Sequence, residues 1–166
     1  MIGFGSLDDD AGTGSTTANV AIFGNADKSR ESGWWQVEYF KPDKSKLGAP
    51  TLTCYLTLVG YLSKVFNEAH DASTLALAAG VLKPPSANEK DLDHFDRRLM
   101  TTWLNIVNGA VEYTAFVDTN GDKVPDTSVG AALTSIEAIR LTPGVTKTQL
   151  LAQIQVLKLI DKVDEN

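Results

Sequence analysis

The sequence predicts a mainly α-helical fold: a single-domain bundle of five or six helices with one or two short strands near the N-terminus. Apolar residues recur at three- and four-residue spacing in several segments after residue 50, as on the buried face of a helix. Segments that contain Pro and Gly separate them. The 166 residues, 43% of them hydrophobic and 22% charged, are enough for one domain with an apolar core, expected over residues 18–166.

The first 17 residues are rich in Gly, Ser, Thr and Asp, a composition that does not bury enough apolar surface to order itself. We expect a flexible leader that orders only on a partner. Residues 18–23, ANVAIF, are compatible with a strand, which must pair or pack with a later segment or with another subunit. The first twelve residues lack the basic and apolar regions of a signal peptide.

The helices are expected in order along the rest of the chain. Residues 26–40 are mixed, and Pro and Gly make 41–50 a loop. Helical spacing then covers residues 51–66, 71–82, 91–111, 128–141 and 150–163. Asp71 is the expected N-cap of the second of these helices, and Thr146 with Gln149 forms a capping box before the last.

Charge and composition disfavour several classes of protein. The net charge is −6, with 15 basic and 21 acidic residues, and three aspartates surround the densest basic pair, Arg97–Arg98. Nucleic acids and anionic membrane surfaces need clustered basic side chains, so we expect neither as a partner. No apolar stretch is long enough to predict membrane insertion. The single cysteine, Cys54, excludes an internal disulfide and is expected to be a buried small hydrophobe.

Residues 118–126, DTNGDKVPD, predict a calcium-binding loop. Ca²⁺ takes six to eight oxygen ligands, and a loop that wraps one ion offers them at alternate positions. The candidate ligands are Asp118, Asn120, Asp122, Val124 through its carbonyl, and Asp126. Gly121 permits a tight turn, and Mg²⁺ is less favoured because it keeps its waters.

The loop departs from an EF-hand at two positions. An EF-hand has Gly at position 6 and a bidentate Glu at position 12, where this chain has Lys123 and Val129. The remaining ligand must come from elsewhere: Asp8, Asp9 or Asp10 of the leader, in this chain or a neighbouring subunit, or Glu112. The alternative interpretation is a solvated loop of Asx turns in which Asp126 or Ser128 caps the next helix.

With three carboxylates and an incomplete shell, the predicted dissociation constant is about 10⁻⁴–10⁻³ M. Such a site fills where Ca²⁺ is abundant, which favours an extracellular or cell-surface location.

The loop's spacing resembles the Asp-rich loops of thrombospondin type 3 repeats. Four segments, SRESGWWQ, YLTLVGYLSKVFNEA, RRLMTTWLNIVNGAV and DTNGDKVPDTSVGAALTSIEAI, also occur in the order seen in a helical domain of exported and cell-surface proteins of bacteria and archaea. The resemblance covers about residues 29–160, with Gln36 in place of that domain's usual Lys. It implies export, a helical core and a role at the cell surface, and it carries over no catalytic activity.

Other candidate sites are weaker. Trp34, Trp35 and Tyr39 could form a glycan-stacking surface, although a core position for these aromatic side chains is favoured. His70 and His94 each lie next to aspartates in the sequence and are candidates for an acid/base pair or a metal site. No nucleophile, phosphate-binding or zinc motif accompanies them.

Three functions remain open. The favoured one is a non-enzymatic, calcium-stabilised surface protein that assembles with copies of itself or with other surface proteins. A carbohydrate- or protein-binding module that uses Trp34 and Trp35 is the alternative, and an enzyme of unknown class is third.

Overall fold

The computed structural model describes residues 24, 26 and 28–163, and it confirms a mainly helical fold with a few short strands. The described residues form six α-helices, a short 3₁₀-helix, a π-helical turn and two strands. They are α1 (Ser32–Phe40), η1 (Pro42–Lys44), α2 (Ala49–Leu62), η2 (Val65–Ala69), α3 (Leu75–Val81), α4 (Asp91–Val107), β1 (Phe116–Val117), β2 (Thr127–Ser128), α5 (Val129–Arg140) and α6 (Lys147–Ile160). The expected leader and the strand at 18–23 lie outside the described residues. The two observed strands instead flank the Asp-rich loop.

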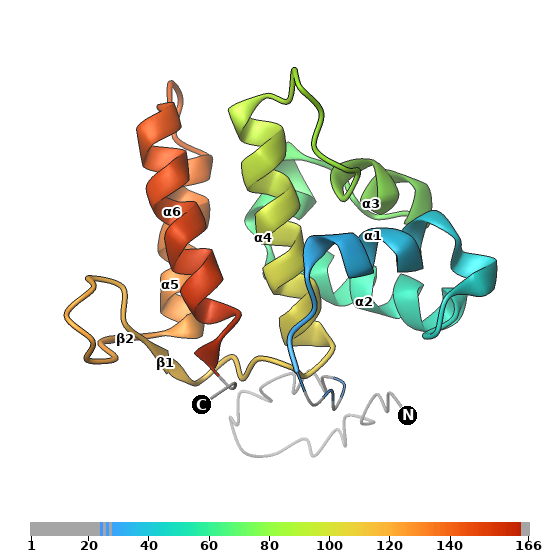
Figure 1. The fold of residues 1–166 in the computed structure, drawn as a ribbon, viewed down its shortest axis with the longest axis horizontal. Coiled ribbons are helices and arrows are strands. Elements are labelled where there is room, and N and C mark those ends of the chain that lie inside the picture. The colour runs from blue at the N-terminus through green and yellow to red at the C-terminus, as the bar shows by residue number, and fades with distance from the viewer. Residues whose placement is uncertain (1–23, 25, 27, 164–166) are drawn as a thin grey trace, which may run out of the picture.

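Helix α4 stands at the centre of the bundle, with α5 and α6 on one side and α1, α2 and α3 on the other (Figure 1). Every residue from Leu99 to Val107 is buried, which fits a helix that is covered on all sides. Its polar residues find partners there. The amide oxygen of Asn105, for example, accepts from Trp35 Nε1 at 2.9 Å, which joins α4 to α1.

The prediction that the 91–111 helix continues to residue 111 is wrong, because the helix ends at Val107. Gly109 adopts a left-handed φ of 81°. Its N–H bonds to the Ile106 carbonyl, and that of Ala110 bonds to the Asn105 carbonyl, both at 2.9 Å. This is the Schellman ending, which glycine favours because it has no Cβ. It turns the chain toward β1.

The two predicted helix caps had different outcomes. The capping box of Thr146 and Gln149 is confirmed at the start of α6. Asp71 does not cap α3: its carboxylate accepts from the Ser73 N–H at 2.9 Å, while Thr74 Oγ1 accepts from Leu77 N–H at 3.2 Å. The chain makes an Asx turn at Asp71 first, so the helix begins later than its apolar pattern suggests.

The start of α5 is held close to the central helix by an aromatic pair. The Tyr113 ring stacks on Trp103 of α4 with their centroids 6.2 Å apart. A Cβ atom at Gly130 would lie only 2.5 Å from Cζ of Tyr113, so glycine allows this close approach. The contact fixes where the segment that carries the Asp-rich loop leaves the bundle. Within the described residues, no helix combines the length and apolarity needed to span a bilayer.

Candidate functional site

The Asp-rich loop, residues 118–126, closes a two-stranded antiparallel ribbon. Phe116 pairs with Ser128 and Val117 with Thr127. Val117 is buried, and Val129 N–H donates to the Ala115 carbonyl at 2.8 Å, so the base of the ribbon is anchored to α5. The loop itself projects from the bundle, on the side away from α1 to α3 (Figure 1). An exposed loop on a fixed base is a common setting for a binding site.

The side chains of the loop organise its own backbone. Asp118 Oδ1 accepts from the N–H groups of Asn120 and Gly121, at 3.1 and 2.6 Å, and its Oδ2 accepts from Lys123 N–H at 2.7 Å. Asn120 Oδ1 accepts from Asp122 N–H at 2.9 Å, and Asp122 Oδ1 from Val124 N–H at 2.8 Å. The loop is therefore a succession of Asx turns that places oxygens at alternate positions.

Two residues of the loop have left-handed backbones, Gly121 with φ 86° and Lys123 with φ 69°. Lys123 occupies position 6, where an EF-hand loop uses glycine for its sharp turn. In the sequence, this lysine is a departure from an EF-hand. The structure shows that the lysine adopts a left-handed conformation nonetheless, with its N–H on the first aspartate of the loop. Left-handed φ is uncommon and strained for a residue with a long side chain.

Asp126 holds the two ends of the loop together. Its Oδ1 accepts from both the backbone N–H and the hydroxyl of Thr119, at 3.1 and 2.9 Å. The Thr119 N–H, the largest cause, lowers the pKa of this exposed carboxyl group, so it stays ionised at neutral pH. Asp126 does not cap α5, because the Ser128 hydroxyl takes that position and accepts from Ala131 N–H at 3.3 Å.

The described residues contain no group of three or more His, Cys, Asp or Glu side chains placed to hold a metal ion. In the loop, the carboxylates of Asp118, Asp122 and Asp126 accept from backbone N–H groups instead. Backbone N–H groups reach both oxygens of Asp118, but among the described bonds they reach only Oδ1 of Asp122 and of Asp126. A carboxylate oxygen that accepts one N–H keeps a second lone pair for an ion. Of the additional candidate ligands, Glu112 lies between α4 and β1 and accepts from the Thr114 hydroxyl at 2.7 Å. Asp8, Asp9 and Asp10 lie outside the described residues.

The candidate glycan surface is not assembled on the outside of the protein. Trp35 and Tyr39 are only 0% and 2% exposed, because helix α1 turns them into the core. Trp34 is half-buried: the Trp35 ring meets it edge-on, with centroids 4.8 Å apart, and the Arg30 guanidinium lies 5.0 Å from its centroid. The stacking surface predicted from Trp34, Trp35 and Tyr39 therefore lacks two of its three rings, and the core interpretation describes their positions.

The histidines have different surroundings. His70 Nδ1 lies 2.8 Å from Oδ2 of the buried Asp96, and Arg140 also pairs with this carboxylate, with its Nε 2.7 Å from Oδ1. Sequence reasoning missed this cluster because His70 follows η2, Asp96 lies on α4 and Arg140 lies at the end of α5. His94, considered beside Asp91, shows no bond to it among the described contacts, and Asp91 pairs with Lys147 at 2.8 Å. His70 lines neither of the two described pockets.

Comparison with protein-family models, with curated protein sequences and with solved structures finds no match to this chain. The resemblance to exported helical domains therefore stays a prediction.

Proposed function

We propose that this chain is a non-enzymatic structural domain of an extracellular or cell-surface protein. In this proposal, Ca²⁺ binds the loop 118–126, and the calcium-bound form assembles with other copies or with other surface proteins. The observation that carries the proposal is the left-handed backbone of Lys123 at the sixth position of an alternating Asp/Asn loop. Strained backbone conformations cluster at binding and active sites, so this one is a reason to infer that the loop binds a ligand.

The electrostatics of the loop also support a cation. Three carboxylates lie within nine residues, and within the described chain none of them forms an ion pair with a basic side chain. Lys123 is the one basic residue in this segment. Like charges in one short loop repel each other, and a divalent cation bound among them would attract all three carboxylates.

Assembly is supported by two exposed apolar side chains beside the proposed site. Phe116 on β1 is 60% exposed and Val124 in the loop is 62% exposed. Large apolar side chains on a projecting ribbon are suited to contact with another protein. Calcium would order the loop and so fix the position of Val124 for that contact.

The test combines light scattering with thermal melts of the full chain, in millimolar Ca²⁺ and in chelator. The proposal predicts a higher melting temperature and larger particles in Ca²⁺. The double substitution Phe116→Ser/Val124→Ser should keep the rise in melting temperature and lose the assembly. Tyr61→Ser, which removes an 84% exposed ring from α2, is the matched control and should assemble normally. A chain whose melting temperature and particle size ignore Ca²⁺ would show that the proposal is wrong.

A further inference from the structure

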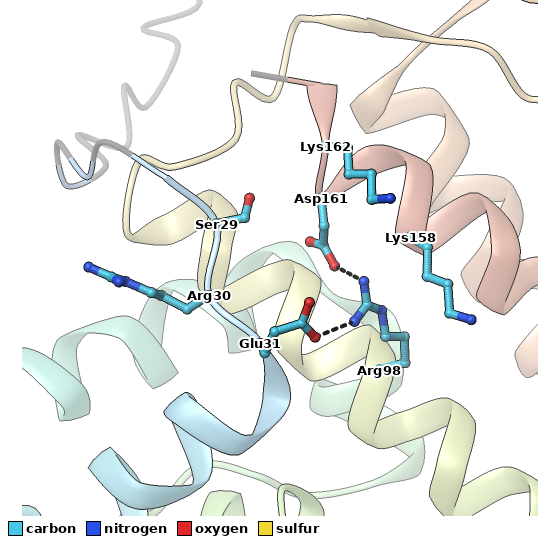
Figure 2. A pocket seen from close by; sticks show the side chains of 7 residues that line it. All are labelled: Ser29, Arg30, Glu31, Arg98, Lys158, Asp161 and Lys162. Atoms are coloured by element: carbon cyan, nitrogen blue, oxygen red, sulfur yellow. Dashed lines mark hydrogen bonds and ion pairs between the residues drawn. The ribbon is translucent and has the colours of Figure 1, made fainter. Parts of the chain in front are cut away.

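A second polar site lies where the end of α6 meets the segment before α1. It is a pocket of about 240 Å³ within the described residues. Its walls are Ser29, Arg30, Glu31, Arg98, Lys158, Asp161 and Lys162 (Figure 2). Pockets for drug-sized ligands span about 300–1,000 Å³, so this one suits a small polar group.

The pocket contains more positive than negative charge, although the whole chain carries −6. Arg98 pairs with Asp161, with Nη2 2.5 Å from Oδ2, and more loosely with Glu31 at 3.4 Å. Lys158 and Lys162 form no ion pair within the described chain. Three cations therefore face two carboxylates. Arg30 is not counted, because it extends away from Arg98 (Figure 2) and lies over the Trp34 ring.

The two lysines lie four residues apart, Lys158 in the last turn of α6 and Lys162 two residues beyond its end. Both line the pocket, so their like charges repel each other there. An anion held between the two ammonium groups would remove that repulsion.

Arg98 has a donor without an acceptor. Its Nε is buried and is the one buried side-chain nitrogen or oxygen among the described residues that lacks a hydrogen-bond partner. Because this nitrogen is buried, it is not open to the pocket, and an anion there meets the guanidinium through its Nη atoms. A guanidinium group binds a tetrahedral oxyanion well because its N–H groups match the spacing of the anion's oxygens.

Asp161 controls how much of the Arg98 charge is available. It also accepts from Asn105 Nδ2 at 3.0 Å and from the Thr102 hydroxyl at 3.2 Å. Burial raises the pKa of Asp161 to about 6, against the opposing effects of Arg98 and these hydrogen bonds. Below that pH the carboxyl group is neutral, and Arg98 loses its closest counter-charge.

We propose that this pocket binds a doubly charged oxyanion of the size of sulfate or inorganic phosphate, held by Arg98, Lys158 and Lys162. The bound anion faces the Arg98 guanidinium and lies between the two lysine ammonium groups. The site is separate from the calcium loop and does not depend on it.

Sulfate is the first probe, because its charge does not change between pH 5 and pH 8. The melting temperature of the full chain is measured against sulfate concentration, with ionic strength held constant by chloride. We expect a saturable rise. The double variant Lys158→Gln/Lys162→Gln should weaken sulfate binding at least tenfold. The matched control Lys41→Gln/Lys44→Gln changes charge equally on exposed lysines around η1 and should bind as the native chain does.

The pH dependence separates a specific site from general screening. The groups that face Asp161 are Arg98 on α4, Glu31 before α1, and Lys158 and Lys162 at the end of α6. Since neutral Asp161 frees Arg98, sulfate should bind more tightly at pH 5.5 than at pH 7.5. An equal response of all three proteins to sulfate, or no saturable response of the native chain, would overturn the proposal.

Two further probes identify the source of the anion. Inorganic phosphate and glycerol phosphate are titrated in the same way. If inorganic phosphate and glycerol phosphate bind equally well, the pocket accepts a phosphate ester. If only inorganic phosphate binds, the ligand is the free ion. Either result supports the site, whereas failure of every oxyanion to bind refutes it. Because the calcium experiments do not involve this pocket, failure here leaves the proposed function intact.

Discussion

Asp122→Asn tests calcium binding with little disturbance to the loop. Asp122 uses its Oδ1 to accept one backbone hydrogen bond, from Val124 N–H. An asparagine oxygen can make the same bond, as Asn120 already does two residues earlier. Asp118 is less suitable, because its carboxylate accepts from three backbone N–H groups and its loss would loosen the loop even without calcium. The substitution at 122 therefore removes one charge and leaves the turn in place.

The expected effect follows from ligand linkage. With a dissociation constant of about 10⁻⁴–10⁻³ M and Ca²⁺ at about 10 mM, binding raises the free energy of unfolding of the native chain by roughly 1.4–2.7 kcal/mol. For a domain of this size, that corresponds to a rise of roughly 3–11 °C in melting temperature. Removing one of three charged ligands should abolish most of this rise. In chelator, the variant should melt within about 1 °C of the native chain, because an exposed substitution that keeps its hydrogen bond changes stability little.

The assay is a thermal melt of three proteins, each in Ca²⁺ and in chelator. Asp43→Asn, an exposed change of the same charge in η1, is the control and should keep the full calcium response. If Asp122→Asn responds to Ca²⁺ as strongly as the native chain, Asp122 is not a ligand. If the variant loses equal stability in both conditions, its role is structural and the calcium interpretation fails.

Three other substitutions have distinct expected results. Lys123→Gly relieves the strain of the left-handed backbone (φ 69°) but gives the unfolded chain more conformational freedom. The free energy of unfolding in chelator should therefore rise by no more than about 1 kcal/mol. Calcium affinity, measured by titration calorimetry, should increase. Gly130→Ala places a Cβ atom against Tyr113 and should cost about 1–3 kcal/mol in urea unfolding, equally with and without Ca²⁺. Burial raises the pKa of Asp161 from 3.8 to about 6, so its ionisation costs the fold stability as pH rises between these values. Relative to the native chain, Asp161→Asn should therefore gain roughly 2 kcal/mol in free energy of unfolding between pH 4 and pH 7, and parallel pH profiles would contradict this.

Local patterns predicted the helices well and their ends less well. The capping box at Thr146 is confirmed because it depends on side chains three residues apart. The end of α4 was missed because apolar periodicity continues past Gly109, whose left-handed conformation stops the helix. Asp71 and Thr74 are both acceptable N-cap residues, and only the folded chain distinguishes between them.

The candidate sites show the same division. The Asx turns of the loop are local, so the sequence predicted alternating oxygens correctly, and the solvated-loop alternative correctly named Ser128 as a cap. The pairing of His70 with Asp96 joins residues that are 26 positions apart, and Arg98 meets Asp161 across 63 positions. Such contacts depend on how the helices pack around α4, which periodicity does not reveal.

Backbone amide chemical shifts of the full chain during a Ca²⁺ titration test calcium binding by the loop most directly. If the loop binds calcium, the amides of residues 118–127 should shift together with one midpoint. The amides of Lys123 and Gly121 should shift furthest, because their N–H groups donate to the carboxylate of Asp118, a proposed ligand. Unchanged loop amides, or small shifts spread over all acidic regions of the protein, would contradict calcium binding and leave the loop as a solvated chain of Asx turns.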